Sequence, residues 1–284
     1  MKFGIHSMVW VGDWSPEHAR HAIAATAAAG YDLIELAAID PAEFDTEMTA
    51  KLLAEHGIEA SASLGLDAAT DVSSEDPDVG AAGRARLHDA LRLVRDTGGT
   101  FLCGVIYSAL RKYDRPATER GLANSHETIA ALADEAAASG ITIALEFCNR
   151  YETNILNTTA QTLEFIEVVG RPNVMAHLDT YHMNIEELSM REPVLAAAAA
   201  GRLGYVHIGE SHRGAPGTGS VLWEEFFGAL RQSGYDGVVT FESFSSEVVH
   251  PSFSNTLAIW RNLWSDNTEL ADGALAFMRS HLGR

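Results

Sequence analysis

The chain has 284 residues, of which 46% are hydrophobic and 21% charged, a composition typical of a globular protein. Lys and Arg number 20 against 39 Asp and Glu, giving a net charge of −19. This charge argues against a non-specific nucleic-acid binder or a protein of anionic membrane surfaces, because both rely on Lys and Arg to neutralise phosphates. The chain shows neither an apolar run of about 18 residues nor a secretory leader pattern, so we expect no membrane partner and a cytoplasmic location.

Strand and helix patterns alternate along the chain. Residues 3–10 predict a first strand, and five later segments repeat one unit, in which an Ala- and Leu-rich helix ends in glycine and an apolar strand follows. Glycine is favoured there because a helix end often needs a left-handed residue. The glycines of these units are Gly30, Gly57, Gly98, Gly140 and Gly234. Two more predicted strands, at 174–179 and 205–210, follow helices that lack an evident capping glycine.

Eight strands that alternate with helices, at about 35 residues per unit, predict a parallel sheet with helical crossovers. In a chain of this length they favour one (β/α)8 TIM barrel, a single domain over residues 1–284. An open, doubly wound sheet is the structural alternative. Cys103 and Cys148 lie in apolar, strand-like runs, and we expect buried reduced thiols in preference to a disulfide.

Four ionisable side chains fall at the ends of the last four predicted strands. They are Glu146, Asp179, His207 and Glu242, spaced about one βα unit apart. Because the active site of such a barrel lies at the C-terminal ends of its strands, these side chains are expected to converge on one rim. Three carboxylates and an imidazole would repel each other there unless a cation lay between them. Their oxygen-rich set suits Mn²⁺ or Mg²⁺ better than structural zinc, although any one of them alone could be a helix cap or a surface residue.

Three further polar residues lie in the predicted βα loops, where substrate contacts usually occur: Glu152, His182 and Arg213. His177, two residues before Asp179, is expected to be a core histidine with its hydrogen bonds satisfied. The segment 214–220 is glycine-rich but lacks the Lys-Ser/Thr of a P-loop, so we interpret it as a flexible connection.

Several motifs together resemble the ketose 3-epimerases, the group that contains the D-tagatose, D-allulose and L-ribulose 3-epimerases, in the superfamily of xylose isomerase-like barrels. The resemblance runs the whole length of the chain, and the combination of motifs is more specific than any one of them. The motifs are LEFCNRYETN, HLDTYHMNIEE, YVHIGESHRG and VTFESF, accompanied by SASLGL, EDP and GLANS.

The resemblance implies a free ketose as substrate, and a homodimer or homotetramer as the assembly. It also implies one divalent metal ion per chain, usually Mn²⁺, with Mg²⁺ and Co²⁺ as alternatives. The metal ligands would be Glu146, Asp179, His207 and Glu242, and the substrate contacts Glu152, His182 and Arg213. His6 and Ser63 depart from residues found in several members and would face the distal carbons of the sugar, so the preferred ketose stays open.

Epimerisation at C3 requires that a proton leave one face of the carbon and return to the other, through an anionic cis-enediolate that a cation would stabilise. We hypothesise that Glu146 and Glu242 form this acid–base pair, and that Glu210 accepts a hydrogen bond from the second ring nitrogen of His207. An aldose–ketose isomerase is the nearest alternative, and a non-catalytic, metal-dependent sugar-binding protein is another. A third alternative, an endonuclease for abasic DNA, would need more histidine ligands and a basic DNA-binding face, and the net charge of −19 disfavours it.

Overall fold

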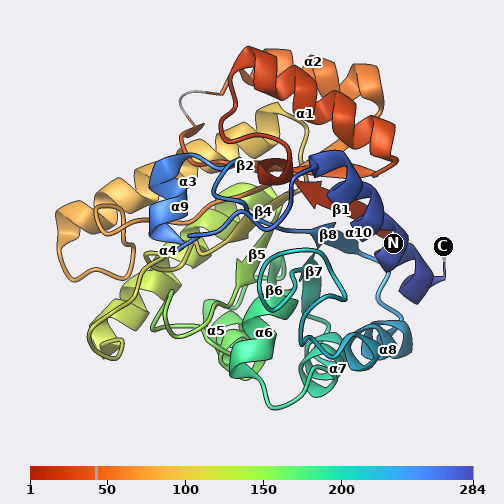
Figure 1. Ribbon diagram of the computed structural model, residues 1–284. Coiled ribbons are helices and arrows are strands. Elements are labelled where there is room, and N and C mark those ends of the chain that lie inside the picture. Colours follow the sequence, from red (N-terminus) through yellow and green to blue (C-terminus); the bar gives the residue numbers. More distant parts are fainter. Residues whose placement is uncertain (42–43, 284) are drawn as a thin grey trace.

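The computed structural model describes residues 1–41 and 44–283. In this part of the chain eight parallel strands close into a barrel, in which each strand pairs with the next along the sequence and β8 pairs with β1 (Figure 1). The strands are β1 (Lys2–His6), β2 (Leu33–Ala37), β3 (Glu59–Ser63), β4 (Phe101–Gly104), β5 (Thr142–Glu146), β6 (Val174–Asp179), β7 (Leu203–Ile208) and β8 (Val238–Phe241). The predicted (β/α)8 fold is confirmed, and the doubly wound open sheet is excluded.

Helices form the outer layer around the strands (Figure 1). They are α1 (Pro16–Ala29), α2 (Thr46–His56), α3 (Pro77–Asp96), α4 (Glu119–Ala137), α5 (Thr159–Val169), α6 (Thr180–Glu186), α7 (Glu192–Ala199), α8 (Trp223–Ser233), α9 (Pro251–Thr256) and α10 (Asn267–Leu282). Their apolar faces pack on the outside of the sheet and make the larger hydrophobic core. None of the helices in the described ranges is both long and apolar enough to cross a membrane.

Glycines end the helices, as the sequence pattern predicts. All five predicted glycines have positive φ: Gly30, Gly57, Gly98, Gly140 and Gly234. The expectation that two units lack such a residue is wrong. Gly170 (φ +64°) caps α5, and Gly201 (φ +65°) lies just beyond α7. Both are hard to recognise from the sequence, because three residues separate Gly170, and one residue separates Gly201, from the strand that follows, and these residues are polar or proline.

The first strand is shorter than predicted. It ends at His6, and a 3₁₀ turn, η1 (Ser7–Val9), replaces the expected continuation to residue 10. The backbone N–H of Met8 donates to Nδ1 of His6, so the side chain of the last strand residue itself caps the turn. This turn directs the chain away from the barrel and leaves His6 at its inner rim.

A small apolar cluster fills the barrel interior toward the N-terminal ends of the strands, which we call its lower end. It includes Leu33, Cys103, Ala144 and Tyr205. Cys103 and Cys148 are both buried and free, as predicted. Because residues two apart on a strand share a face, the positions that follow these on β2, β5 and β7 also point inward, one layer higher. These positions are Glu35, Glu146 and His207, and they place ionisable groups directly above the apolar layer.

Candidate active site

The four ionisable side chains at the strand ends converge, as predicted. Glu146 and Asp179 are the last residues of β5 and β6, His207 is the last but one of β7, and Glu242 directly follows β8. The parallel register pairs Asp179 with His207 across β6 and β7. One possible ligand atom from each of the four lies within 4.8 Å of the others, and all four residues are buried. The closed barrel brings together groups that are far apart in the sequence.

Two of these residues direct unused acceptors into the shared space. Asp179 caps α6 through Oδ1, which accepts a hydrogen bond from the N–H of Tyr181, whereas its Oδ2 is buried without a hydrogen-bond partner. Nδ1 of His207 is also buried without one, 3.5 Å from Oε1 of Glu242 and 3.6 Å from Oε1 of Glu146. Buried acceptors left open in this way are costly unless something else satisfies them.

The second ring nitrogen of His207 has a different partner from the one expected. Nε2 lies 2.9 Å from Oε2 of Glu35, a carboxylate on β2 that is fully buried. The hypothesis that Glu210 accepts this bond is wrong. Glu210 lies two residues beyond β7, where its side chain turns back to the loop that follows, and it binds the backbone there.

Burial and mutual repulsion perturb the ionisation of this cluster. Burial raises the pKa of Glu146 to about 7, with Asp179 and Glu35 adding to the effect. Burial and the charge of Glu242 raise the pKa of Asp179 to about 6. Burial would lower the pKa of His207, but the neighbouring carboxylates, Glu35 first, raise it well above its usual value. The cluster therefore holds more negative charge than its surroundings stabilise.

Arg213 is the cationic side chain that touches this cluster. Its Nη1 donates to Oε2 of Glu242 at 2.7 Å, and its Nη2 lies 3.9 Å from Oε2 of Glu152. The guanidinium stacks 3.9 Å from the ring centroid of Tyr181 and 5.0 Å from that of Phe244. These contacts fix the direction of a long side chain that would otherwise be mobile.

The loop that carries Arg213 is held from within. Arg213 itself has φ +60°, an uncommon conformation for a residue with a side chain, and its carbonyl accepts a hydrogen bond from Ser243 Oγ. The fully buried carboxylate of Glu210 accepts four hydrogen bonds from the same loop. The donors are the N–H groups of Ser211, Gly217 and Val221 and the indole N–H of Trp223. Segment 214–220 is therefore tied down, contrary to its interpretation as a flexible connection.

Asn149 orients the two remaining loop residues that the sequence singles out. Its backbone N–H donates to Nδ1 of His182 at 3.1 Å, and its Nδ2 donates to Oε1 of Glu152 at 2.9 Å. Since Nδ1 of His182 is an acceptor, the ring proton of the neutral imidazole is on Nε2, which lies 3.8 Å from Glu146 and 3.9 Å from Glu152. Burial, reinforced by Arg213, lowers the pKa of His182 well below its usual value. His182 is thus a neutral donor that faces the site.

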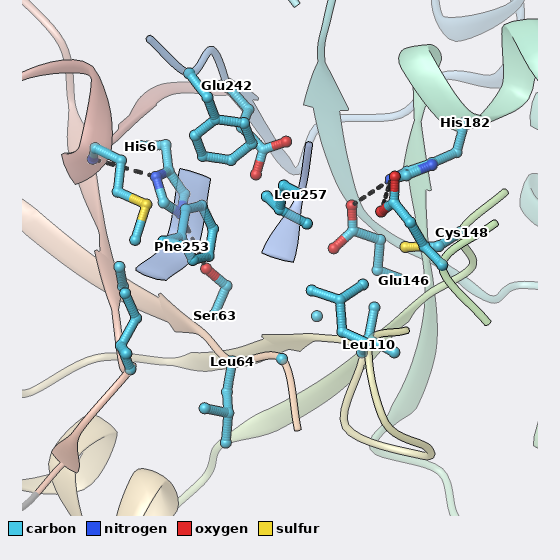
Figure 2. A pocket seen from close by; sticks show the side chains of 18 of the residues that line it. His6, Ser63, Leu64, Leu110, Glu146, Cys148, His182, Glu242, Phe253 and Leu257 are labelled. Atoms are coloured by element: carbon cyan, nitrogen blue, oxygen red, sulfur yellow. Dashed lines mark hydrogen bonds and ion pairs between the residues drawn. The ribbon is translucent and has the colours of Figure 1, made fainter. Parts of the chain in front are cut away.

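An open cavity lies above the cluster, and Glu146, Glu242, His182 and Arg213 are among the residues that line it. Figure 2 shows Glu146 and His182 on one side of it, His6 and Ser63 on the other, and Glu242 above, between the two sides. Nε2 of His6 lies 3.2 Å from Ser63 Oγ, and burial lowers the pKa of His6. Phe253 of α9 and Leu257 close the cavity beside His6 (Figure 2). The two predicted distal contacts therefore lie together, across the cavity from Glu146.

His177 departs from expectation. It is buried, but neither ring nitrogen has a hydrogen-bond partner, so it is not the satisfied core histidine that the sequence suggests. Its ring packs edge-on against those of Tyr205 and His207, with centroids 4.9 and 4.1 Å away. Burial lowers its pKa well below the usual value, so the ring is neutral and packs as an aromatic group.

The donor set fits a divalent cation. Three carboxylates and one imidazole form it, and the imidazole lone pair at Nδ1 is free because Nε2 faces Glu35. A second possible group, made of Glu146, Cys148 and His182, fits less well, because the backbone N–H on Nδ1 of His182 keeps the proton on Nε2. A third group combines Glu146 and His207 with His177 and so shares two members with the first.

Comparisons with known proteins agree with this geometry. Residues 23–281 match the family model described as xylose isomerase-like TIM barrel. The chain is 54% identical to a ketose 3-epimerase of Arthrobacter globiformis over 99% of this chain and 97% of that protein. It is 55% identical to an L-ribulose 3-epimerase of Methylomonas sp. (strain DH-1) over 98% and 97% of the two chains. A crystal structure of D-allulose 3-epimerase from Methylomonas sp. in complex with D-allulose superposes with a TM-score of 0.97 at 54% identity, covering 99% of this chain and 97% of that one.

Proposed function

Because this chain belongs to the ketose 3-epimerases, a group of xylose isomerase-like TIM barrels, we propose that it epimerises free ketoses at C3 by a cation-dependent, two-glutamate mechanism. The observation that carries the cation dependence is the charge of the site. Arg213 pairs with two of the five buried or nearly buried carboxylates at or beneath the site, which are Glu35, Glu146, Glu152, Asp179 and Glu242. A divalent ion would balance this excess.

Glu146, Asp179, His207 and Glu242 would hold the ion. When bound, it supplies positive charge that polarises the ketose carbonyl and stabilises the anionic intermediate. The unpartnered Oδ2 of Asp179 and Nδ1 of His207 support this assignment, because both are buried acceptors that a cation would satisfy.

Glu146 and Glu242 move the proton. One carboxylate oxygen takes the C3 proton while the C–H electron pair forms the C2–C3 double bond of the cis-enediolate. The other glutamate, in its acid form, then gives a proton to the opposite face of C3. The direction of the reaction sets which glutamate acts first.

The surrounding residues orient the sugar. Nε2–H of His182 and the guanidinium of Arg213 face the site as donors and would bind O2 as charge develops there. Glu152, an acceptor held by Asn149, would accept from the C1 hydroxyl. His6 and Ser63 would meet the distal hydroxyl groups, and the preference among D-allulose, D-fructose, D-tagatose and L-ribulose would depend on this end of the cavity.

The test is turnover in D₂O with each of these ketoses, with the chelator-treated protein as control and Mn²⁺ added back. An epimerase inverts C3 and incorporates deuterium there, only with metal. Label at C1 or C2 with an aldose product would identify an aldose–ketose isomerase instead. Sugar binding without any exchange at C3 would identify a non-catalytic binding protein.

Three finer expectations stay predictions. Mn²⁺ is expected to be the preferred ion, ahead of Mg²⁺ and Co²⁺, at one per chain. A homodimer or homotetramer is expected, as is a cytoplasmic location. Metal analysis of the purified protein and light scattering measure the first two directly.

A further inference from the structure

Glu35 is a buried carboxylate that neither the proposed acid–base pair nor the proposed cation ligands include. Glu35 lies in β2, on the wall of the barrel beneath the site, and it is fully buried, with 0% of its surface exposed. Oε2 lies 2.9 Å from Nε2 of His207 and accepts a hydrogen bond from the hydroxyl of Tyr205 at 2.8 Å. Oε1 has no hydrogen-bond partner and lies 3.7 Å from Nε2 of His6.

We propose that Glu35 is a positioning residue that fixes the tautomer and orientation of His207, so that the Nδ1 lone pair points at the cation site. The proposal rests on the proposed function, because it presumes a cation between the four strand-end residues. Glu35 itself would touch neither cation nor ketose.

The first argument is the proton on His207. With a cation bound, His207 is a neutral imidazole with one N–H and one acceptor nitrogen, whereas the carboxylate of Glu35 can only accept. Oε2 of Glu35 therefore places the ring proton on Nε2, which leaves Nδ1 as the acceptor. That nitrogen faces Glu146, Asp179 and Glu242 at 3.5–3.9 Å. Without Glu35 either nitrogen could carry the proton, and one of the two tautomers would direct N–H at the cation.

The second argument is the hydrogen-bond network that holds Glu35 in place. The Tyr205 hydroxyl that donates to Glu35 is in turn 2.7 Å from Ser61 Oγ and 2.8 Å from Thr240 Oγ1. This network draws on four different strands and ends on His207. A buried charge with such support is typical of a group that orients a ligand.

The third argument is the contact with His6. Nδ1 of His6 accepts from the N–H of Met8, so its ring proton is on Nε2, between Ser63 Oγ and the open oxygen of Glu35. One carboxylate thus faces both a candidate cation ligand and a candidate distal sugar contact. Glu35 would fix the orientation of both rings at once.

The experiment measures Mn²⁺ affinity without any substrate, by the electron paramagnetic resonance signal of free Mn²⁺ during titration. Glu35→Gln keeps a hydrogen-bond acceptor for His207 but removes the charge, and Glu35→Leu removes both. We expect the dissociation constant to rise about 10- to 100-fold in Glu35→Gln, and further in Glu35→Leu. Tyr205→Phe removes only the hydroxyl that supports Glu35 and leaves the contact between Glu35 and His207, so it should raise the dissociation constant by less than Glu35→Gln does. Wild-type affinity in folded Glu35→Gln and Glu35→Leu would overturn the proposal.

A measurement on the wild-type protein covers the case in which these variants do not fold. In the Mg²⁺-loaded protein, long-range ¹H–¹⁵N spectra report which ring nitrogen of His207 carries the proton. We expect the Nε2–H form, and an Nδ1–H form contradicts the proposal whatever the variants do. A failure of the proposed function is distinguishable from both outcomes, because wild-type protein would then bind no Mn²⁺ at the site or show no C3 exchange.

Discussion

Glu210→Gln tests the structural role of the carboxylate that holds the loop after β7. The substitution preserves size and removes one acceptor oxygen. Oε1 accepts from the N–H groups of Ser211 and Val221, and Oε2 from Gly217 N–H and the Trp223 indole. Whichever way the glutamine amide turns, its NH₂ group faces two N–H donors, so two of the four hydrogen bonds are lost.

The cost follows from the kind of bond that is lost. Hydrogen bonds to a charged group contribute about 1.5–3 kcal/mol each, so two of them amount to about 3–6 kcal/mol. Gly217 is an exposed residue, so water can replace the lost bond to its N–H, which favours the lower end of this range. For a chain of this size about 3 kcal/mol corresponds to a decrease in Tm of about 6 °C. Turnover should fall too, because the loop holds Arg213 against Glu242.

The assay is urea unfolding with Mn²⁺ present, followed by circular dichroism. Glu224→Gln, at the exposed start of α8, is the control and should change the free energy of unfolding by less than about 0.5 kcal/mol. Wild-type stability in Glu210→Gln would refute the anchoring role.

Three further predictions concern the acid–base pair, the charge of the site and the backbone. Glu242→Gln should keep the fold and lower both C3 epimerisation and deuterium incorporation by about 10²- to 10⁴-fold; near-normal turnover would remove it from the mechanism. In the chelator-treated protein, the pKa values of Glu146 and Asp179 lie above those of the unfolded chain, near 4. Below about pH 6.5 the buried histidines His6, His177 and His182, whose pKa values are lowered, act in the opposite sense, because they take up protons on unfolding. Between about pH 6.5 and pH 8 these histidines are neutral in both states, so the release of the remaining carboxyl protons on unfolding should make the free energy of unfolding fall, and Mn²⁺ should restore it at pH 8; greater stability of the chelated protein at pH 8 than at pH 6.5 would contradict this. Gly104→Ala should destabilise the protein more than Gly57→Ala in urea unfolding, because both positions have positive φ but only at Gly104 would the new Cβ lie 2.5 Å from a backbone oxygen; equal losses would contradict the steric reasoning.

The barrel and the convergence of four ligand-type residues are predictable because both follow from local patterns. Helix-ending glycines mark the units, and a parallel barrel brings all strand ends to one rim, so the positions of Glu146, Asp179, His207 and Glu242 in their strands suffice. Which other polar groups support them depends on contacts across the barrel, which no sequence spacing encodes.

Glu35 and Glu210 illustrate this limit. Glu210 is three residues from His207 in the sequence, so local reasoning favours it as the partner. Oε2 of Glu35 lies 2.9 Å from Nε2 of His207, although the two residues are 172 positions apart in the sequence. A signal was available: Glu35 interrupts the apolar run of a strand that is otherwise buried, and a charge is rarely placed there without a partner. The sequence around Asn149 does not indicate its role in orienting His182 and Glu152, because that role depends on its backbone N–H as much as on its side chain.

The Glu35–His207 contact also bears on how such barrels can be recombined. The proposed chemistry resides in β5–β8, while His6 and Ser63, at the far end of the cavity, come from β1 and β3. Exchanging the first half of the chain with that of another barrel would therefore be an attractive way to alter sugar preference. The graft would succeed only if the donor half brings a carboxylate at position 35, since the second half cannot orient its own histidine alone.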